Sequence, residues 1–345
     1  MPSVPEDSPT LASTRALWGG IAFSLLFTAL IAWAGARLDA VPLLPDQGAS
    51  WYYWKLPEPT LWSRTTSWLF YAAHQISFWG LIYYAQTRVA RYSNGLHRAN
   101  IWALATNAFF IVLHFLQTHL WYDGLAQDVT IWSSQFSVIL MLVFILIMEN
   151  PRRGLFFGRQ APLSRDVTQW LKKYHGYLFA WAAVYTFWYH PMVNTQGHLI
   201  GFVYMFFLMV QGSLFLTRAH LNRYWMVTQE LFVLFHGTLV AYNQGNGIWP
   251  MFFFGFAGMF VITQVHGLGW PIWARWGSVA LWLGGAFLLY SSRGFGKIDE
   301  TIRIPFIEYL LVFLLTWLFA ATAWVIRRIS PSVEPSAATR PQDVA

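Results

Sequence analysis

Five histidines lie where an imidazole side chain can bind a metal or carry a proton. His74, His114 and His236 each lie inside a long apolar segment. His190 and His198 are the first and last residues of the short loop HPMVNTQGH, which predicts that they lie close together. Neutral imidazole is a ligand for iron, copper and zinc, and it is an axial ligand of b-type haem. An ordinary pKa of about 6.5 also suits histidine to relay protons. These residues therefore predict either a cofactor site or a proton path.

Glu230 and His266 form a second group, nearer the opposite ends of their apolar segments. An ionisable residue inside a membrane is costly and usually has a partner or a function. One interpretation of Glu230 is a neutral, hydrogen-bonded carboxyl group that ties helices together. The other is an entry point for protons, with Glu230 and His266 as the catalytic residues that supply them. Asn107 and Gln117 are expected to form hydrogen bonds between helices.

Residue spacing and composition restrict the chemistry. His114 and His119 are five residues apart, about 140° around a helix, so one metal ion bound to both requires a distorted helix end. The chain has no cysteine, which excludes thiolate metal sites, iron–sulfur clusters, cysteine nucleophiles and disulfide bonds. GxSxG, HExxH, P-loop and dinucleotide-binding motifs are also missing from the sequence. The remaining chemistry is cofactor binding by histidine, or proton transfer.

The composition indicates an integral membrane protein. Apolar residues make up 56% of the 345 residues and charged residues only 11%, whereas soluble domains have about 25% charged residues. The net charge of +7 comes from basic residues in short segments between apolar runs, where membrane topology explains them. The sequence has no aromatic and basic platform for single strands, so nucleic acid is not an expected partner.

Ten apolar runs have the length of roughly 20 residues that crosses a hydrocarbon core. We expect helices rather than strands because the runs are long and continuous. The predicted spans are residues 16–36, 66–87, 99–121, 131–149, 174–191, 198–218, 224–244, 250–270, 276–292 and 305–326. The sequence therefore predicts an all-α, polytopic membrane helix bundle of about ten transmembrane helices.

Lysine and arginine predict the orientation of this bundle. They follow the even-numbered runs, whereas the loops at 122–130, 192–197 and 245–249 contain none. The loop at 293–304 departs mildly from this pattern. By the positive-inside rule both termini are cytoplasmic, in a multi-pass protein of the cell membrane, here a bacterial inner membrane. The predicted parts are a cytoplasmic segment at 1–15, one transmembrane domain at 16–328 and a disordered cytoplasmic tail at 329–345.

The favoured hypothesis is a membrane oxidoreductase whose site lies in the outer half of the bilayer. In this orientation His190 and His198 lie at the outer interface, and His74, His114 and His236 lie roughly 10 to 13 Å below it. The expected cofactor is haem b or a transition metal ion, iron or copper, bound by His74, His114, His190 and His236. His198 is a further metal ligand in the second case. The expected substrate is a quinone, a membrane lipid or an isoprenoid.

Two other classes of function stay open. A transporter or channel would use the same histidines to bind a permeating metal ion or to relay protons. Transporters often have two related halves or helices interrupted by Gly and Pro, and no such symmetry is visible in the sequence. The third class is a cofactor-free lipid enzyme, or a structural subunit of a membrane complex that tolerates His114→Ala and His236→Ala.

Overall fold

The computed structural model describes residues 10–45, 47–48, 54–89 and 91–329, which form ten α-helices and no β-strand. Each helix overlaps one of the ten predicted apolar runs. The helices are α1 (Leu11–Ala34), α2 (Leu61–Arg88), α3 (Arg98–Trp121), α4 (Ile131–Arg153), α5 (Arg165–Tyr189), α6 (Gln196–Ser213), α7 (Arg223–Asn243), α8 (Trp249–Ile262), α9 (Ile272–Arg293) and α10 (Glu300–Ile329). The protein is thus an all-helical bundle.

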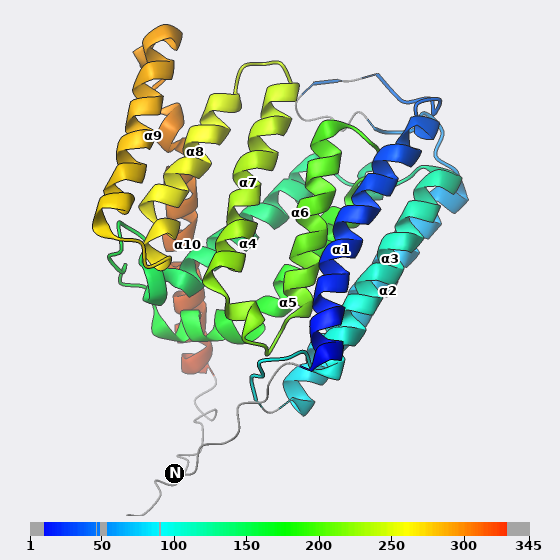
Figure 1. Cartoon of the computed structure of the whole chain (residues 1–345), viewed down its shortest axis with the longest axis horizontal. Helices are drawn as coiled ribbons and strands as arrows, with labels where there is room; N and C mark the ends of the chain where they lie inside the picture. Colours follow the sequence, from blue (N-terminus) through cyan, green and yellow to red (C-terminus); the bar gives the residue numbers. More distant parts are fainter. Residues whose placement is uncertain (1–9, 46, 49–53, 90, 330–345) are drawn as a thin grey trace, which may run out of the picture.

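The helices lie side by side and consecutive helices run in alternating directions (Figure 1). Helices α1, α2 and α3 form one side of the bundle, α8, α9 and α10 form the other, and α4 to α7 lie between them. The start of α1 and the end of α10 lie at the same end of the bundle. Most of the predicted terminal segments, residues 1–9 and 330–345, lie outside the described residues, whereas residues 11–15 begin α1.

Six helical segments among the described residues are long and apolar enough to cross a membrane. They are Leu11–Leu38, Arg98–Trp121, Ile131–Arg153, Trp249–Gly267, Ile272–Arg293 and Phe295–Ile326. Large apolar side chains such as Leu281 and Leu288 of α9, 79% and 72% exposed, cover the outside of the bundle. A surface of this kind suits hydrocarbon rather than water. These features are those of a membrane protein.

Two predicted helix ends differ from the structure. Helix α4 continues through Pro151 to Arg153 and ends at Gly154, whose φ of +72° only glycine adopts readily. Helix α8 stops at Ile262, eight residues before the predicted end, and a short 3-10 turn follows from Gln264 to Gly267. Arg153 is thus the last residue of α4 rather than a loop residue, and His266 lies in the 3-10 turn after α8 rather than in the α-helix itself.

Two apolar cores hold the helices together. One lies between α1, α3, α5 and α6 and contains Trp188 and Phe206, both almost fully buried. The other lies between α4, α5, α8 and α10 and includes Ile147 and Val312. Helix α5 contributes to both, so it joins the two sides of the bundle.

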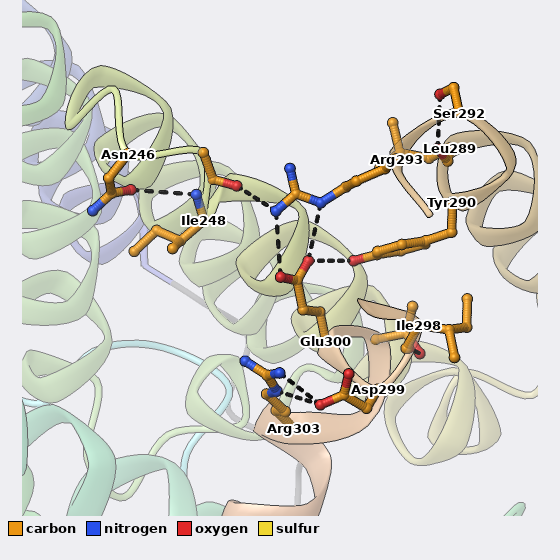
Figure 2. A network of polar contacts seen from close by, with 12 residues as sticks. Asn246, Ile248, Leu289, Tyr290, Ser292, Arg293, Ile298, Asp299, Glu300 and Arg303 are labelled. Carbon is orange, nitrogen blue, oxygen red and sulfur yellow. Dashed lines mark hydrogen bonds and ion pairs between the residues drawn. The ribbon is translucent and has the colours of Figure 1, made fainter. Parts of the chain in front are cut away.

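A polar network fixes the start of α10 against its neighbours (Figure 2). The carboxylate of Glu300 accepts hydrogen bonds from the Tyr290 hydroxyl at 2.8 Å and from Nε and Nη2 of Arg293 at 3.3 Å. Arg293 also donates to the carbonyl oxygen of Gly247, in the turn between α7 and α8, at 2.7 Å. Arg303 pairs with Asp299 close by. These pairs neutralise two of the basic residues in the loop that departed from the positive-inside pattern.

Candidate functional site

Three of the predicted histidines lie together at one end of the bundle. His190 follows α5, His198 lies in the first turn of α6, and their ring centroids are 5.3 Å apart. His236 of α7 is close enough to interact electrostatically with both. The short loop between α5 and α6 brings His190 and His198 together, as the sequence predicted. His236 reaches them because Gly201 of α6 leaves room for its ring, and a Cβ at that position would lie 2.9 Å from Nε2.

The other two predicted ligands, His114 and His74, are fully buried and hydrogen-bonded. Nε2 of His114 donates to the carbonyl oxygen of His190 at 2.8 Å, and Nδ1 lies 3.1 Å from the side-chain amide of Gln117. Nδ1 of His74 accepts a hydrogen bond from the Trp188 indole at 3.2 Å. The proton of neutral His74 is therefore on Nε2, which donates to Oδ1 of Asn107 at 2.9 Å.

These contacts bear on the predicted cofactor. Both ring nitrogens of His74 are hydrogen-bonded, so His74 must break a hydrogen bond before it can bind haem iron or a metal ion. Neutral His114 donates only from Nε2, and its Nδ1 faces Oε1 of Gln117. Within the described part of the chain, no group of three or more His, Cys, Asp or Glu side chains is arranged to hold a metal ion. In this structure His74 is thus placed as a hydrogen-bonding residue between α2, α3 and α5.

Three polar residues form a stripe along one face of α3, and this stripe was not predicted from the sequence. Asn100, Asn107 and His114 are seven residues apart, which returns to nearly the same face of a helix every two turns. All three are at most 4% exposed. Asn107 donates to the Met209 carbonyl oxygen at 3.1 Å and to the Ser213 hydroxyl at 3.0 Å, which joins α3 to α6. Asn107 is thus an interhelical contact, as predicted, and the equal spacing was visible in the sequence.

Near the other end of the bundle, Glu230 forms a buried ion pair that the sequence did not predict. Its Oε1 atom lies 2.8 Å from Nη1 of Arg153, and the two side chains are 7% and 1% exposed. Arg153 reaches this position because α4 continues through Pro151 and its last residue faces α7. The interpretation of Glu230 as a neutral carboxyl group that ties helices together is replaced by this ion pair.

A cavity of about 20 Å³ adjoins the ion pair, between α4, α7, α8 and α10. Its polar lining consists of Arg153, Glu230, Gln264 and Glu308, and the rest is apolar. Nε and Nη2 of Arg153, Oε2 of Glu308 and Oε1 of Gln264 are buried and have no hydrogen-bond partner among the described residues. Unpaired buried polar atoms are uncommon and mark places where water, an ion or a substrate binds. We therefore take this cavity as the candidate functional site.

Glu230 and His266 were predicted to supply protons together, but His266 does not line this cavity. His266 lines a separate cavity of about 70 Å³ with Phe157, Arg275 and Trp276. Glu308, which lines the Glu230 cavity, was overlooked in the sequence, although an acid near the start of an otherwise apolar run is a recognisable signal.

Tyr204 of α6 lies close to both Glu230 of the cavity and His236. Its ring centroid is 6.4 Å from that of His236, and its hydroxyl is close enough to Glu230 to interact electrostatically. Glu230 and His236 face different directions on α7, and Tyr204 bridges the gap between them from the neighbouring helix. The order Glu230, Tyr204, His236 and His190 thus forms a series of titratable groups along the bundle.

Asp123 lies in the loop after α3 and is only 1% exposed. Its Oδ1 accepts a hydrogen bond from the Gly124 amide at 2.7 Å, and Oδ2 has no partner among the described residues. Burial raises the pKa of the Asp123 carboxyl group to about 6.

Comparisons of the chain with models of protein families, with curated proteins and with solved structures gave no match.

Proposed function

We propose that this protein is a proton-coupled transporter of the cell membrane, with ten membrane-spanning helices and both termini in the cytoplasm. The observation that carries the proposal is the cavity lined by the Arg153–Glu230 ion pair and by Glu308, whose Oε2 atom has no hydrogen-bond partner among the described residues. One region of this apolar bundle thus contains two acidic residues and one basic residue.

The free-energy cost of such groups supports a functional role. Removing charges from water costs several kcal/mol per ion, on the order of what a good ion pair returns. Glu308 has no ion-pair partner among the described residues, so nothing in the static structure offsets its burial. Intramembrane acids of this kind mark proton and substrate pathways in pumps and transporters. We infer that Glu308 takes up and releases a proton during transport.

The remaining titratable groups supply a route for that proton across the bundle. Glu230 begins the series, Tyr204 follows, and His236 and His190 continue it to the opposite end. Histidine suits the outer positions because its protonation changes near neutral pH. This arrangement favours the hypothesis in which the histidines relay protons.

The oxidoreductase hypothesis has less support from the geometry. It assigns haem b, iron or copper to His74, His114, His190 and His236, with a quinone, lipid or isoprenoid as substrate. His74 has both ring nitrogens engaged in hydrogen bonds, and His114 uses its one N–H to bind the His190 carbonyl oxygen. A Soret band in the purified protein, with a reduced α-band after dithionite, would favour the oxidoreductase over the transporter.

Proton uptake by proteoliposomes tests the proposal. Vesicles that contain the full chain and an entrapped pH-sensitive dye receive an inside-negative potential from potassium and valinomycin. Panels of small acids, amino acids and metal ions are then added outside. We expect protein-dependent acidification with at least one panel, at least about tenfold slower in Glu308→Gln.

Glu149→Gln is the matched control, because Glu149 is also a helical glutamate beside an arginine, Arg152, but is 20% exposed and does not line the cavity. This variant should acidify the vesicles at the wild-type rate. No acidification above that of empty vesicles with any panel, or equal rates in wild type and Glu308→Gln, contradicts the proposal.

A further inference from the structure

The guanidinium group of Arg153 uses only one of its two hydrogen-bonding edges. Nη1 binds Glu230, whereas Nε and Nη2 are buried and have no hydrogen-bond partner among the described residues. These two nitrogens form the side of the guanidinium fork that binds carboxylate or phosphate oxygens in pairs. Leaving both N–H groups unpaired is unfavourable, because each has lost its water without gaining an acceptor. The vacant edge therefore calls for an acceptor with two oxygens.

We propose that the Nε–Nη2 edge of Arg153 binds the carboxylate group of a small aliphatic monocarboxylic acid, which is the transported solute. As a statement about transport this rests on the proposed function, whereas the binding itself does not. The chemistry of the cavity sets the class of ligand, because its non-polar lining surrounds the polar edge. That lining consists of Leu142, Ile145, Leu146, Val233, Phe256 and Met259.

The charges around the edge favour a monovalent anion. Glu230 and Arg153 neutralise each other, so the pair has no net charge to repel an incoming anion. A second negative charge on the ligand would meet Glu230 and Glu308 in the same cavity without a further cation, since Arg153 is its one basic lining residue among the described residues. Phosphate and dicarboxylates are thus disfavoured.

The size of the cavity also favours a small ligand. A volume of about 20 Å³ exceeds the roughly 10–15 Å³ that one water molecule needs, but it is too small for a whole acid unless the walls move. Phe256 and Met259 of α8 form part of the wall, and unbranched methionine adapts its shape easily. A short alkyl chain can be accommodated by movement of these side chains, while a sugar or nucleotide cannot.

Binding of butyrate to the detergent-purified full-length protein tests the inference. The probe is sodium butyrate, measured by isothermal titration, with butyramide as the uncharged analogue and sodium chloride as the ionic-strength control. Arg153→Lys keeps a positive charge beside Glu230 but lacks the planar fork. We expect this variant to raise the dissociation constant for butyrate by about tenfold or more, as loss of a charge-assisted pair of hydrogen bonds implies.

Arg152→Lys is the matched control, because Arg152 is the preceding residue and pairs with Glu149 at the surface. It should bind butyrate as the wild type does. Glu308→Gln removes an acid from the cavity and should bind butyrate at least as tightly, a result that general damage to the fold would not produce. Equal affinity in wild type and Arg153→Lys, or weaker binding in Glu308→Gln, overturns the inference.

A comparison on the wild type alone keeps the inference testable if Arg153→Lys does not fold. Butyrate should raise the thermal unfolding midpoint, while butyramide and chloride should not. An equal rise with chloride would identify a salt effect and overturn the inference. Butyrate binding without proton uptake would refute only the transport proposal, and proton uptake without butyrate binding would refute only the assignment of the solute.

Discussion

Breaking the Arg153–Glu230 ion pair from one side should be far more destabilising than removing both residues together. The two side chains are 1% and 7% exposed, and Nη1 and Oε1 are 2.8 Å apart. Arg153→Met leaves the Glu230 carboxylate buried without its cation, and Glu230→Leu leaves the guanidinium group without an anion. Each single substitution is expected to cost about 3–5 kcal/mol of unfolding free energy.

The double substitution Arg153→Met with Glu230→Leu removes both charges and both desolvation penalties. Replacing a buried ion pair with apolar residues of similar volume is often neutral or stabilising. We therefore expect the double variant to lie within about 2 kcal/mol of the wild type, rather than near the sum of about 6–10 kcal/mol for the single variants. Proton uptake should nevertheless be lost, because the cavity then contains no charged pair.

The assay is unfolding of the full-length protein by titration of non-ionic detergent micelles with SDS, followed by tryptophan fluorescence. The surface pair of Arg152 and Glu149, 36% and 20% exposed, provides a matched cycle with an expected coupling of about 0–1 kcal/mol. The reasoning is refuted if the coupling of the buried pair is no larger than that of the surface pair. It is also refuted if the double variant loses as much unfolding free energy as the two single variants lose in sum.

Two further predictions concern residues outside the cavity. Asp123 has a folded-state pKa of about 6 against an ordinary value of 3.8, so the native state holds this proton more tightly than the unfolded chain. Stability should therefore fall by up to about 3 kcal/mol as the pH rises from about 4 to 6, and remain low above that range. Asp123→Asn should abolish this slope in thermal unfolding measured across that pH range, and a slope equal to that of the wild type would count against the burial of the carboxyl group. Asn107→Leu removes the acceptor for His74 and two donors to α6, so it should cost about 2–4 kcal/mol in the SDS titration yet leave proton uptake unchanged. Loss of uptake in a folded Asn107→Leu protein would show that the α3 stripe has a role in transport.

The number and order of the helices followed from the sequence because apolar runs of about 20 residues have few alternatives to helix in a membrane. Helix ends were harder to predict. Pro151 lacks an N–H and usually ends or kinks a helix within it, but here it lies in the last turn, where α4 ends only three residues later. Helix α8 ended early inside an apolar run, so hydropathy alone gave no signal of the 3-10 turn that contains His266.

Contacts among the candidate residues were predicted only where the local sequence determines that two residues lie close together. A loop of a few residues joins His190 to His198, so their approach was predictable. Arg153 and Glu308 were missed because the positive-inside rule assigns an arginine at a helix end to water, and a lone acid has no spacing pattern. Their shared cavity depends on the packing of α4 and α10 against α7 and α8, which no local pattern encodes.

The buried polar residues of α3 differ from those of the cavity in how completely they are hydrogen-bonded. On α3, Nε2 of His114 donates to the His190 carbonyl oxygen and the side-chain amide of Asn107 has partners on α6, and hydrogen bonds of this kind fix helices in one arrangement. In the cavity, Arg153 and Glu308 retain unpaired atoms although they are almost fully buried. Selection for stability alone would favour apolar residues at those two positions, because a partly satisfied polar group is worse than none. Substitutions on α3 should therefore affect folding alone, whereas substitutions of the charged residues in the cavity should also affect activity.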